Sequence, residues 1–406
     1  MRCLRPWPRF VVGALTLATG GGALTGCSGH DAVSSVSSAS SDSSAPPAIT
    51  TPLQSALPMS SGSAAVVAMG TLDDPLNTFW QLFVRPDPTA PWTLATPPGV
   101  ADNGGLVVSA APGVGPSGAW SLLAGFEPSQ ALAFSPLSVS ADGGATWAPG
   151  AVDGALALVP DALASSSSSR MLALLRARGG VVLHSAGDPT TWSTLVDQRA
   201  LASSAAGRTC GVGALTAVAL DSGGAPLVGS SCSTGNVVGV FALSGGEWQR
   251  RGPFLATGVA AAPTDVLRLA QVGDVTGVLV AVGGRVPGIV ALAATADGAW
   301  GESGVLPLPA GTRLVSTAVE PGGGFVVLTS DHGSLALDEE AGAGTDFQAR
   351  PAPPAGTQVA LVGPGGELDA LVVASTVCTD WRFDPSTGTW ARAGSVTVPI
   401  QFGSSD

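Results

Sequence analysis

The feature of this 406-residue chain that most constrains its fold is an aromatic residue that recurs directly after a polar turn. Each turn is rich in Gly, Asp, Pro, Ser or Thr, and each aromatic precedes a short stretch of mixed polarity. A repeat of about 40–50 residues is expected for units of four antiparallel strands arranged around an axis. The aromatic markers are Trp92, Trp147, Trp192, Trp248, Trp300, Phe347 and Trp390, with separations of 55, 45, 56, 52, 47 and 43 residues.

The segments between these markers favour strands over helices. In the fourth repeat, Gly213–Leu220, Ala225–Ser231, Asn236–Leu243 and Glu247–Pro253 are predicted strands separated by turns. Continuous apolar runs such as Val278–Val282 are typical of strands that are covered on both faces. Helix signals are nearly absent, so the sequence predicts an all-β domain.

The turn before Trp147 carries a specific motif. Ser140, Asp142, Gly144, Thr146 and Trp147 match the pattern S-x-D-x-G-x-T-W at all five fixed positions. In such a turn the Asp142 carboxylate accepts hydrogen bonds from nearby backbone N–H groups, and glycine supplies the positive φ that the turn needs. The motif resembles the Asp-box, or BNR repeat, of sialidase-like β-propellers. The resemblance implies that these five residues stabilise the fold and take no part in catalysis.

Together, the repeat and this resemblance predict a seven-bladed β-propeller of four-stranded antiparallel blades over residues 63–403. A six-bladed ring is the alternative, because the first repeat is the poorest and its fourth strand is obscure around Pro52–Leu57. Closing the ring would remove exposed sheet edges. The C-terminal stretch Ser395–Phe402 is a candidate for that closure.

The N-terminus predicts a lipid anchor. Three arginines in the first nine residues precede an apolar stretch, Phe10–Leu24, and the sequence Leu24-Thr25-Gly26-Cys27 resembles the bacterial lipobox. The resemblance implies that residues 1–26 are a lipoprotein signal peptide and that Cys27 is acylated, which would hold the protein at a membrane. The alternatives are an ordinary secretory signal and a short membrane anchor, although Gly20–Gly22 interrupt the stretch.

Residues 27–62 are predicted to form a flexible tether. The segment is rich in Ser and Pro and has few large apolar side chains, so it cannot bury enough surface to offset its ordering entropy. Such a chain would hold the propeller away from the extracytoplasmic face of the cell membrane. An O-glycosylated stalk is the alternative.

Charge and composition narrow the class of partner. All 17 basic residues are Arg and the chain lacks Lys and Tyr, a usage typical of GC-rich, actinobacterial-type coding sequences. Removing the three arginines of the signal peptide leaves 14 Arg against 29 acidic residues, a net charge of 14 − 29 = −15. Nucleic-acid binding requires clustered Arg or Lys, so nucleic acid is not an expected partner. A monomer that binds a protein, a glycan or the cell wall is expected.

Two cysteines are predicted to form a disulfide. Cys210 and Cys232 flank a predicted hairpin whose turn lies near Asp221–Gly223, and disulfides are typical of secreted proteins. The alternative is two buried thiols in adjacent strands. Cys378 is predicted to be a small buried hydrophobic residue, because no His is near in the sequence to lower its pKa.

Catalytic, metal and cofactor sites are not predicted. Sialidases, as the resemblance implies, use a Tyr nucleophile and an Arg triad, and this chain has no Tyr. The sequence Arg285-Val286-Pro287 only weakly matches their Arg motif and lies in the wrong part of the chain. The histidines lack the spacing of metal ligands. They are His30, His184 and His332.

Three carboxylate pairs are candidates for glycoside hydrolysis, which needs two acids close together. Asp73–Asp74, Glu339–Glu340 and Glu367 with Asp369 lie in or beside predicted turns, where acids are expected to be solvated. Candidate ligand-facing arginines are Arg268, Arg285, Arg313 and Arg382.

The sequence therefore predicts a non-catalytic binding or scaffolding module. The alternative is a cell-envelope glycoside hydrolase with an unrecognised active site, and a third hypothesis is an assembly factor. An enzyme should bring Asp, Glu and Arg together at the channel mouth with shifted pKa values. A binding module should present an apolar or aromatic patch instead.

Overall fold

The computed structural model divides into two compact units, Met1–Asp42 and Ser43–Asp406, and only the second contains described residues. The signal peptide, Cys27 and most of the tether lie outside them. Within the described part of the chain, no helix is long and apolar enough to cross a membrane. The described residues are 56–58, 62–70, 78–100, 105–111, 121–129, 135–149, 158–166, 170–187, 189–256, 262–284, 287–295, 298–342, 344–363 and 368–399.

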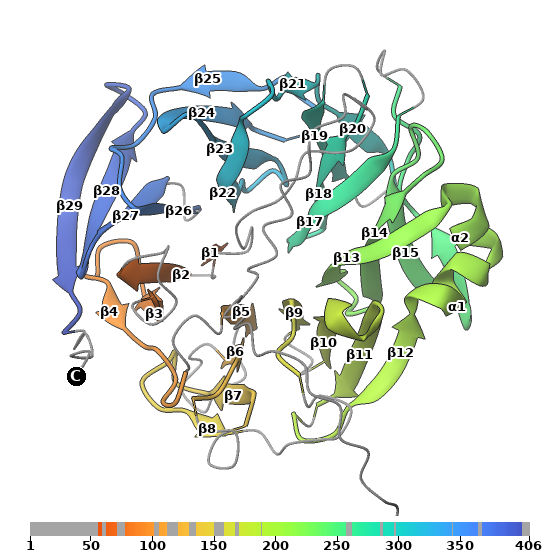
Figure 1. Ribbon diagram of the computed structural model, residues 1–406, viewed down its shortest axis with the longest axis horizontal. Coiled ribbons are helices and arrows are strands. Elements are labelled where there is room, and N and C mark those ends of the chain that lie inside the picture. The colour runs from red at the N-terminus through yellow and green to blue at the C-terminus, as the bar shows by residue number, and fades with distance from the viewer. Residues whose placement is uncertain are drawn as a thin grey trace, which may run out of the picture. The chain divides into compact units, whose positions relative to one another are not determined.

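The described part of residues 43–406 is almost entirely antiparallel β-sheet (Figure 1). Five sheets have four strands each, and in each sheet the strands lie side by side in chain order. These sheets are β1–β4 (Ala56–Pro58, Ser63–Gly70, Thr78–Arg85, Thr93–Leu94), β5–β8 (Leu106–Ala111, Ser121–Phe126, Leu137–Ser140, Ala148–Pro149), β9–β12 (Ala162–Ser165, Arg170–Leu175, Val181–Ala186, Ser193–Asp197), β22–β25 (Arg313–Val319, Phe325–Asp331, Ser334–Glu340, Gln348–Arg350) and β26–β29 (Gln358–Val362, Asp369–Ala374, Val377–Asp384, Thr389–Thr397).

A sixth, nine-stranded sheet consists of two arrays of consecutive strands. Cys232 of β14 pairs with Thr264 of β17, and Ser231 pairs with Asp265, so two residue pairs join the arrays. The first array is β13–β16 (Val212–Leu220, Pro226–Cys232, Gly239–Ser244, Glu247–Arg250), and the second is β17–β21 (Thr264–Val272, Val275–Val282, Gly288–Ala294, Trp300–Glu302, Leu306–Pro307).

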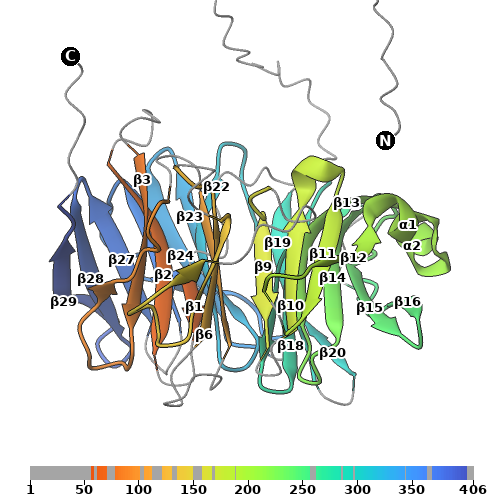
Figure 2. The same ribbon diagram turned by 90° about the horizontal axis from the view of Figure 1, so that it is seen from below.

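The sheets and arrays follow one another around a centre in chain order, and their strands run between the two faces of the ring (Figures 1 and 2). Neighbours share buried clusters, and β18 shows how. Val278, Val280 and Val282 pack toward the β13–β16 array, whereas Leu279 and Ala281 pack toward the β22–β25 sheet. Successive side chains of a strand point to opposite faces, so the apolar run is continuous because both faces are covered.

The ring closes by packing between the first and last sheets. Val67 and Phe83 of the first sheet share a core with Leu371 and Val373 of the last. Up to residue 399, where the described residues end, the C-terminal stretch does not pair with the first sheet as considered from the sequence, although Val398 packs into the core that the first and last sheets share. Its residues up to Thr397 belong to β29, which pairs with β28 of its own sheet. A tight turn brings β29 directly against β28, and within the described residues no strand is exchanged across this junction.

The aromatic markers lie at the fourth strand of each sheet or array, at its start or within two residues of it. Three of them also tie neighbouring sheets together. The indole N–H donates to the carbonyl of the residue that follows the preceding outer strand. The pairs are Trp147 to Ala95 (2.9 Å), Trp300 to Arg251 (3.0 Å) and Trp390 to Pro351 (2.7 Å). The repeat in the sequence is therefore a repeat of inter-sheet contacts.

Replacing Trp147 with phenylalanine is expected to lower the free energy of unfolding by about 1 kcal/mol, because the buried Ala95 carbonyl loses its donor. Denaturant unfolding measures the change. Trp248→Phe is the matched control, since no inter-sheet hydrogen bond from its indole is present among the described residues. If the two variants lose equal free energy of unfolding, the hydrogen bond from Trp147 to Ala95 does not stabilise the contact between the sheets.

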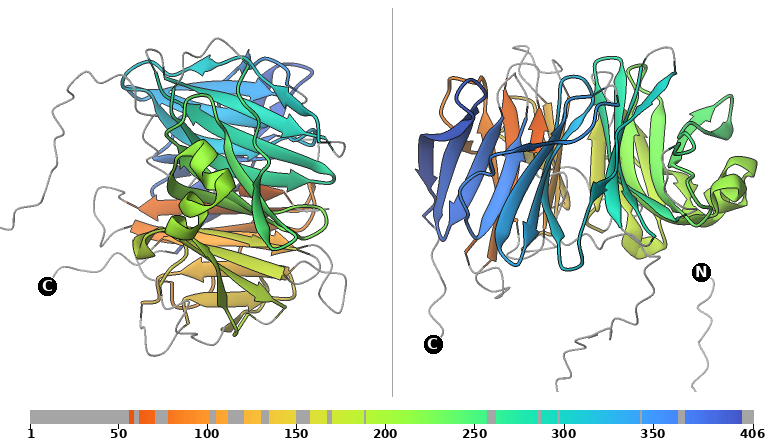
Figure 3. Two further views of the ribbon diagram at one scale, coloured as in Figure 1. Left: turned by 90° about the vertical axis from the view of Figure 1, so that its right-hand side faces the viewer. Right: turned by 90° about the horizontal axis from the view of Figure 1, so that it is seen from above.

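Two short helices were not predicted from the sequence. The helices α1 (Gln198–Ser203) and α2 (Ala205–Cys210) connect β12 to β13 and lie on the outside of the ring (Figure 3). Asp197 caps α1 by accepting from Ala200 N (2.6 Å), and Ser204 caps α2 by accepting from Gly207 N (2.9 Å). These capping residues are the sequence signal from which the two helices could have been predicted. In addition, β1 begins at Ala56, inside the predicted tether, and pairs with β2.

Candidate functional site

The innermost strands surround a central cavity of about 150 Å³. Its wall mixes apolar side chains with a few polar ones, and the hydroxyls of Ser109 and Ser165 are 2.8 Å apart. Arg268 of β17 also lines it, but the side chain is buried and not exposed as expected from the sequence. Its Nη1 donates to the backbone oxygen (2.7 Å) and hydroxyl (2.8 Å) of Thr317 on β22. Burial lowers the pKa of Arg268 to about 10, so it stays charged at neutral pH and links two neighbouring inner strands.

Asp265, near the start of β17, is an acid on an inner strand with a strongly shifted pKa. Burial raises the pKa of Asp265 to about 6, while the Thr216 hydroxyl and the charge of Arg176 act in the opposite direction. Arg176 also pairs with Asp161, with Nε 3.2 Å from Oδ1. Arg268 and Arg176 therefore already have partners, whereas Asp265 Oδ1 has no hydrogen-bond partner among the described residues.

A denser group of charges lies where the first and last sheets meet, and we call this junction the seam. Arg85 of β3 donates to Asp369 of β27, and Arg382 Nε of β28 donates to the other carboxylate oxygen of Asp369 at 3.2 Å. Arg382 Nη2 reaches the carbonyl of Pro88 (2.8 Å). The Arg85 guanidinium also lies 4.8 Å from the centroid of the Trp92 ring.

A second carboxylate at the seam is less well paired. Asp380 Oδ2 lies 3.9 Å from Arg85 Nη1, beyond hydrogen-bond distance. Burial and the nearby Asp369 raise the pKa of Asp380 to about 6. Burial also raises the pKa of Asp369 and outweighs the two arginines bound to it. Both acids are held in the fold at a cost in desolvation.

A surface pocket of about 270 Å³ opens beside Asp380. Its walls come from the β1–β4 and β26–β29 sheets. Apolar and buried groups form the inner wall, and exposed residues form the rim. The inner wall includes Phe83, Trp92, Leu371, Cys378 and Asp380, and the rim includes Thr89, Pro91, Ala393 and Ser395.

The motif around Trp147 forms a compact turn between β7 and β8. Asp142 accepts hydrogen bonds from Thr146 N (2.8 Å) and Thr146 Oγ1 (2.6 Å), and Ser140 Oγ accepts from Gly144 N (2.7 Å). These bonds, those from Thr146 first, lower the pKa of Asp142 to about 2. Gly144 has φ 93°. The turn contacts the preceding sheet and lies apart from both the central cavity and the seam pocket.

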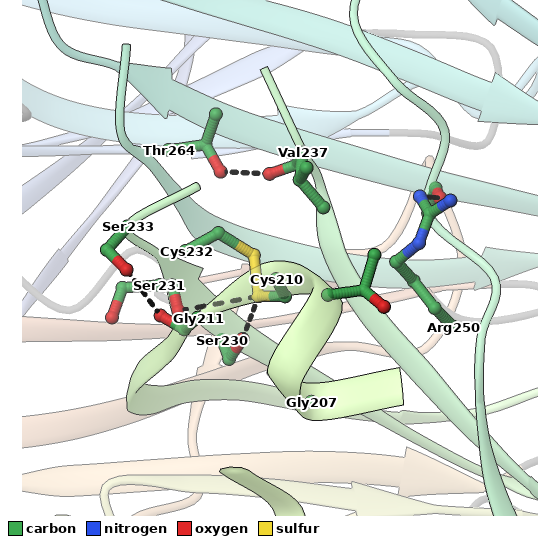
Figure 4. The surroundings of a disulfide bond; sticks show 12 residues. Gly207, Cys210, Gly211, Ser230, Ser231, Cys232, Ser233, Val237, Arg250 and Thr264 are labelled. Carbon is green, nitrogen blue, oxygen red and sulfur yellow. Dashed lines mark hydrogen bonds between the residues drawn. A yellow bond between two sulfur atoms is a disulfide. The ribbon is translucent and has the colours of Figure 1, made fainter. Parts of the chain in front are cut away.

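Cys210 and Cys232 form a disulfide that joins the end of α2 to β14 (Figure 4). Their Cα atoms are 5.0 Å apart, within the usual range. The bond lies where β14 meets β17, since Cys232 pairs with Thr264. Cys378 is a free, buried thiol, and burial, followed by the charge of Asp380, raises its pKa to about 12.

Replacing both Cys210 and Cys232 with alanine is expected to lower the free energy of unfolding by about 3 kcal/mol, because the bond closes a loop of about 22 residues. Denaturant unfolding with and without dithiothreitol tests this. Reductant should destabilise the native protein and leave the variant unchanged. A native midpoint that does not respond to complete reduction would contradict the expectation.

The carboxylate pairs only partly match the expectation that they are solvated. Glu339 pairs with Arg350 at 2.9 Å, but Glu340 is buried and Asp369 is fully buried, so the expectation is wrong for both. Glu340 Oε1 accepts from Gly342 N (3.0 Å) and Thr345 N (3.1 Å), which organises a turn. Asp73, Asp74, Glu367 and Arg285 lie outside the described residues.

The remaining candidates are dispersed. His184 Nε2 contacts Ser193 Oγ at 2.8 Å, and the exposed His332 lies 3.6 Å from Asp331. Arg313 is exposed at the start of β22. Among the residues that the structure describes, no group of three His, Cys, Asp or Glu side chains could hold a metal ion. Sequence reasoning missed the seam because Arg85 of β3 is far in sequence from Asp369 and Asp380 of the paired strands β27 and β28, and no local motif marks the three.

Comparison with protein-family models gave no match, and comparison with curated proteins gave none either. Solved structures do match. A prolyl endopeptidase aligns over 86% of this chain and 50% of its own length, with 13% identity and a TM-score of 0.45. This chain thus spans about half the length of that enzyme.

Two further matches have slightly higher TM-scores. A putative 6-phosphogluconolactonase from Bacteroides fragilis aligns over 86% of this chain and 97% of its own, with 13% identity and a TM-score of 0.50. A puromycin-hydrolysing peptidase from Mycobacterium tuberculosis aligns over 88% and 57%, with 12% identity and a TM-score of 0.51. At these identities the likeness concerns the fold alone. The fold is that of a β-propeller, as the sequence predicted.

Proposed function

We propose that this protein is a non-catalytic binding module, a lipid-anchored propeller that holds a protein, glycan or cell-wall partner at the extracytoplasmic face of the cell membrane. The single observation that carries the proposal is that the arginines in and beside the core are bound to groups of the fold itself. Arg268 is bound to Thr317, and Arg85 and Arg382 are both bound to Asp369. Charges used in this way hold the ring together, and the loops at its faces are left for recognition.

We also infer that the ring has seven blades and that the Ser140–Trp147 turn is an Asp-box. The two arrays of the nine-stranded sheet share only two residue pairs, and each has four strand positions, because β20 and β21 of the second array both pair with β19. Each array therefore counts as a blade. The seven aromatic markers, one at each fourth strand, support this count. The hydrogen bonds of Asp142 and Ser140 are those expected of an Asp-box.

The anchor is tested by Cys27→Ala in a bacterial host that processes lipoproteins. We propose that the protein with Cys27 fractionates with membranes and that the variant is released into the soluble extracytoplasmic fraction. Cys378→Ala is the control, because it removes a thiol from the folded domain and leaves the lipobox intact. Retention of the Cys27→Ala variant in the membrane would argue against lipid anchoring.

The binding role is tested with the purified full chain and isolated cell-wall material. Saturable co-sedimentation of the folded chain, lost after unfolding, with no release of reducing sugar, is the expected result. Saturable release of sugar would overturn the non-catalytic role. Failure to sediment would remove the cell wall as the partner, and the same measurement with immobilised membrane proteins then tests the protein class.

One observation favours the alternative, a cell-envelope glycoside hydrolase. Burial, together with the charges of Glu339 and Glu340, raises the pKa of Glu320 to about 7, a value suited to a general acid. However, Glu339 is paired with Arg350 and Glu340 organises a turn. If sugar release is seen, Glu320→Gln should abolish it under this alternative.

A further inference from the structure

Unpaired buried polar atoms are concentrated at the seam. Among the described residues, seven buried side-chain nitrogen or oxygen atoms lack a hydrogen-bond partner, and four of them belong to Arg85, Trp92 and Asp380. Buried polar atoms are nearly always satisfied by protein, water or a ligand, so such a concentration marks a place where a further polar group is expected. The three side chains surround the inner wall of the seam pocket, which Trp92 and Asp380 line directly.

Asp380 is the unpaired acidic group that lines the pocket. The residue is only 6% exposed, it lines the pocket, and its Oδ1 has no partner in the described part of the chain. The Trp92 indole N–H is close enough to affect the carboxylate, but neither Trp92 Nε1 nor Asp380 Oδ1 completes a hydrogen bond of ordinary geometry. Oδ1 itself is closed to solvent, so we treat the Asp380 carboxylate as an acceptor that a ligand contacts after a small shift of this side chain.

The other charges at the seam are already engaged. Asp369 binds Arg85 and Arg382, so it neutralises much of both cations, and Arg382 also donates to the Pro88 carbonyl. Arg85 Nη1 is 3.9 Å from Asp380 Oδ2 and leaves the other oxygen without a partner. The protein as a whole is acidic, with a formal net charge of −12, which attracts cations.

From this arrangement we propose that the seam pocket binds a primary alkylammonium group, with its nitrogen on Asp380 Oδ1 and its hydrocarbon stem against Phe83, Leu371 and Trp92. The proposal rests on the binding role proposed above and names the chemistry of one contact. The ligand enters between Pro91 and Ala393 on the exposed rim. The pocket, at about 270 Å³, is large enough for a side-chain-sized group.

The same features disfavour other ligands. Arg382 also lines the pocket, but Asp369 already pairs with it, so a carboxylate or phosphate would gain little there and would be repelled by Asp380 on the inner wall. A quaternary ammonium has no N–H to donate to Oδ1. A hydrated inorganic cation would gain nothing from the apolar wall of Phe83 and Leu371. A primary ammonium both neutralises the carboxylate and donates to it, which is the stronger kind of hydrogen bond.

The experiment is calorimetric titration of the full chain with n-butylammonium chloride at constant ionic strength. Saturable binding is expected, whereas sodium butyrate, butan-1-ol, tetramethylammonium chloride and sodium chloride should give no saturable heat. The proposal is overturned if n-butylammonium does not bind, or if butyrate or butanol binds equally well.

Variants of the pocket residues test whether n-butylammonium binds in the seam pocket. Asp380→Asn should weaken n-butylammonium binding by about tenfold or more, because a charge-assisted hydrogen bond is lost. Asp384→Asn is the matched control, since this acid lies on the same strand outside the pocket. If Asp380→Asn does not fold, Ala393→Trp narrows the rim without touching Asp380 and should abolish binding. Unchanged affinity in a folded Asp380→Asn or Ala393→Trp protein would refute the site.

Two further probes distinguish two possible sources of the primary ammonium group. A free diamine is represented by cadaverine, and a lysine side chain of a partner protein by a short peptide with an acetylated N-terminus and a single lysine. Tighter binding of one of them than of n-butylammonium identifies the source, and both outcomes support the pocket. Failure of this inference is seen in the amine titrations, whereas failure of the binding role is seen as sugar release.

Discussion

Replacing Asp369 with alanine is expected to lower the free energy of unfolding by about 3–5 kcal/mol, because two arginines at the seam lose their shared counter-charge. Arg85 is almost completely buried and would be left charged beside Trp92 and the weakly paired Asp380. The seam is where a ring built from consecutive strands must close without a covalent connection between its first and last sheets. Urea unfolding followed by tryptophan fluorescence measures the loss.

The control for this variant is Asp384→Ala, an acid of the same sheet that caps its own turn by accepting from Ser386 N at 2.8 Å. Its loss should be about 1 kcal/mol. Replacing Arg85 with methionine together with Asp369→Leu should recover much of the stability, since removing both charges removes their desolvation cost. If Asp369→Ala costs no more than Asp384→Ala, the ion pairs do not hold the ring closed.

The contrast between the repeat and the seam shows what the sequence could predict. The aromatic markers recur because each blade repeats the same inter-sheet contact, as in Trp147 to Ala95 and Trp390 to Pro351. A local contact that recurs at a fixed period is visible in a single sequence. Arg85 and Asp369 are separated by 284 residues and occur once, so no pattern marks them.

The candidate sites also divide into those set by local sequence and those formed by residues far apart in the chain. The turn around Asp142 is determined by residues within eight positions, and its hydrogen bonds follow the local motif. Arg268 seemed a plausible ligand-facing residue because isolated arginines in a sequence are mostly exposed. Its burial depends on Thr317 of a different sheet, which only the closed ring brings close. The seam pocket likewise exists only after both ends of the propeller have met.

Lowering the pH from 7.5 to 5 is expected to stabilise this protein, opposite to the usual response of an acidic protein whose acids are mostly paired. Burial raises the pKa of Glu320 to about 7 and the pKa values of Asp265 and Asp380 to about 6. In the unfolded chain these groups release their protons near pH 4. As the pH rises from about 4 to 7, the unfolded state therefore ionises first and stability falls, and it levels off above about pH 7.

Each of these groups should contribute about 1–2 kcal/mol over that interval. The acids with lowered pKa values affect the free energy of unfolding at lower pH. Hydrogen bonds lower the pKa of Asp142 to about 2 and also lower the pKa of Asp384, so their contribution is present above about pH 4 and is lost as the pH falls below it. The free energy of unfolding should therefore have its maximum near pH 4–5.

Urea unfolding at half-unit steps from pH 3.5 to 8 tests this profile. Glu320→Gln should flatten the slope between pH 5 and 7.5 by about 2 kcal/mol, since the pKa shift of Glu320 is the one that extends closest to neutral pH. Glu247→Gln is the control, because this acid is exposed at the start of β16 and should leave the profile unchanged. Stability that decreases steadily from pH 7.5 to 5 would show that the raised pKa values of Glu320, Asp265 and Asp380 do not govern the fold.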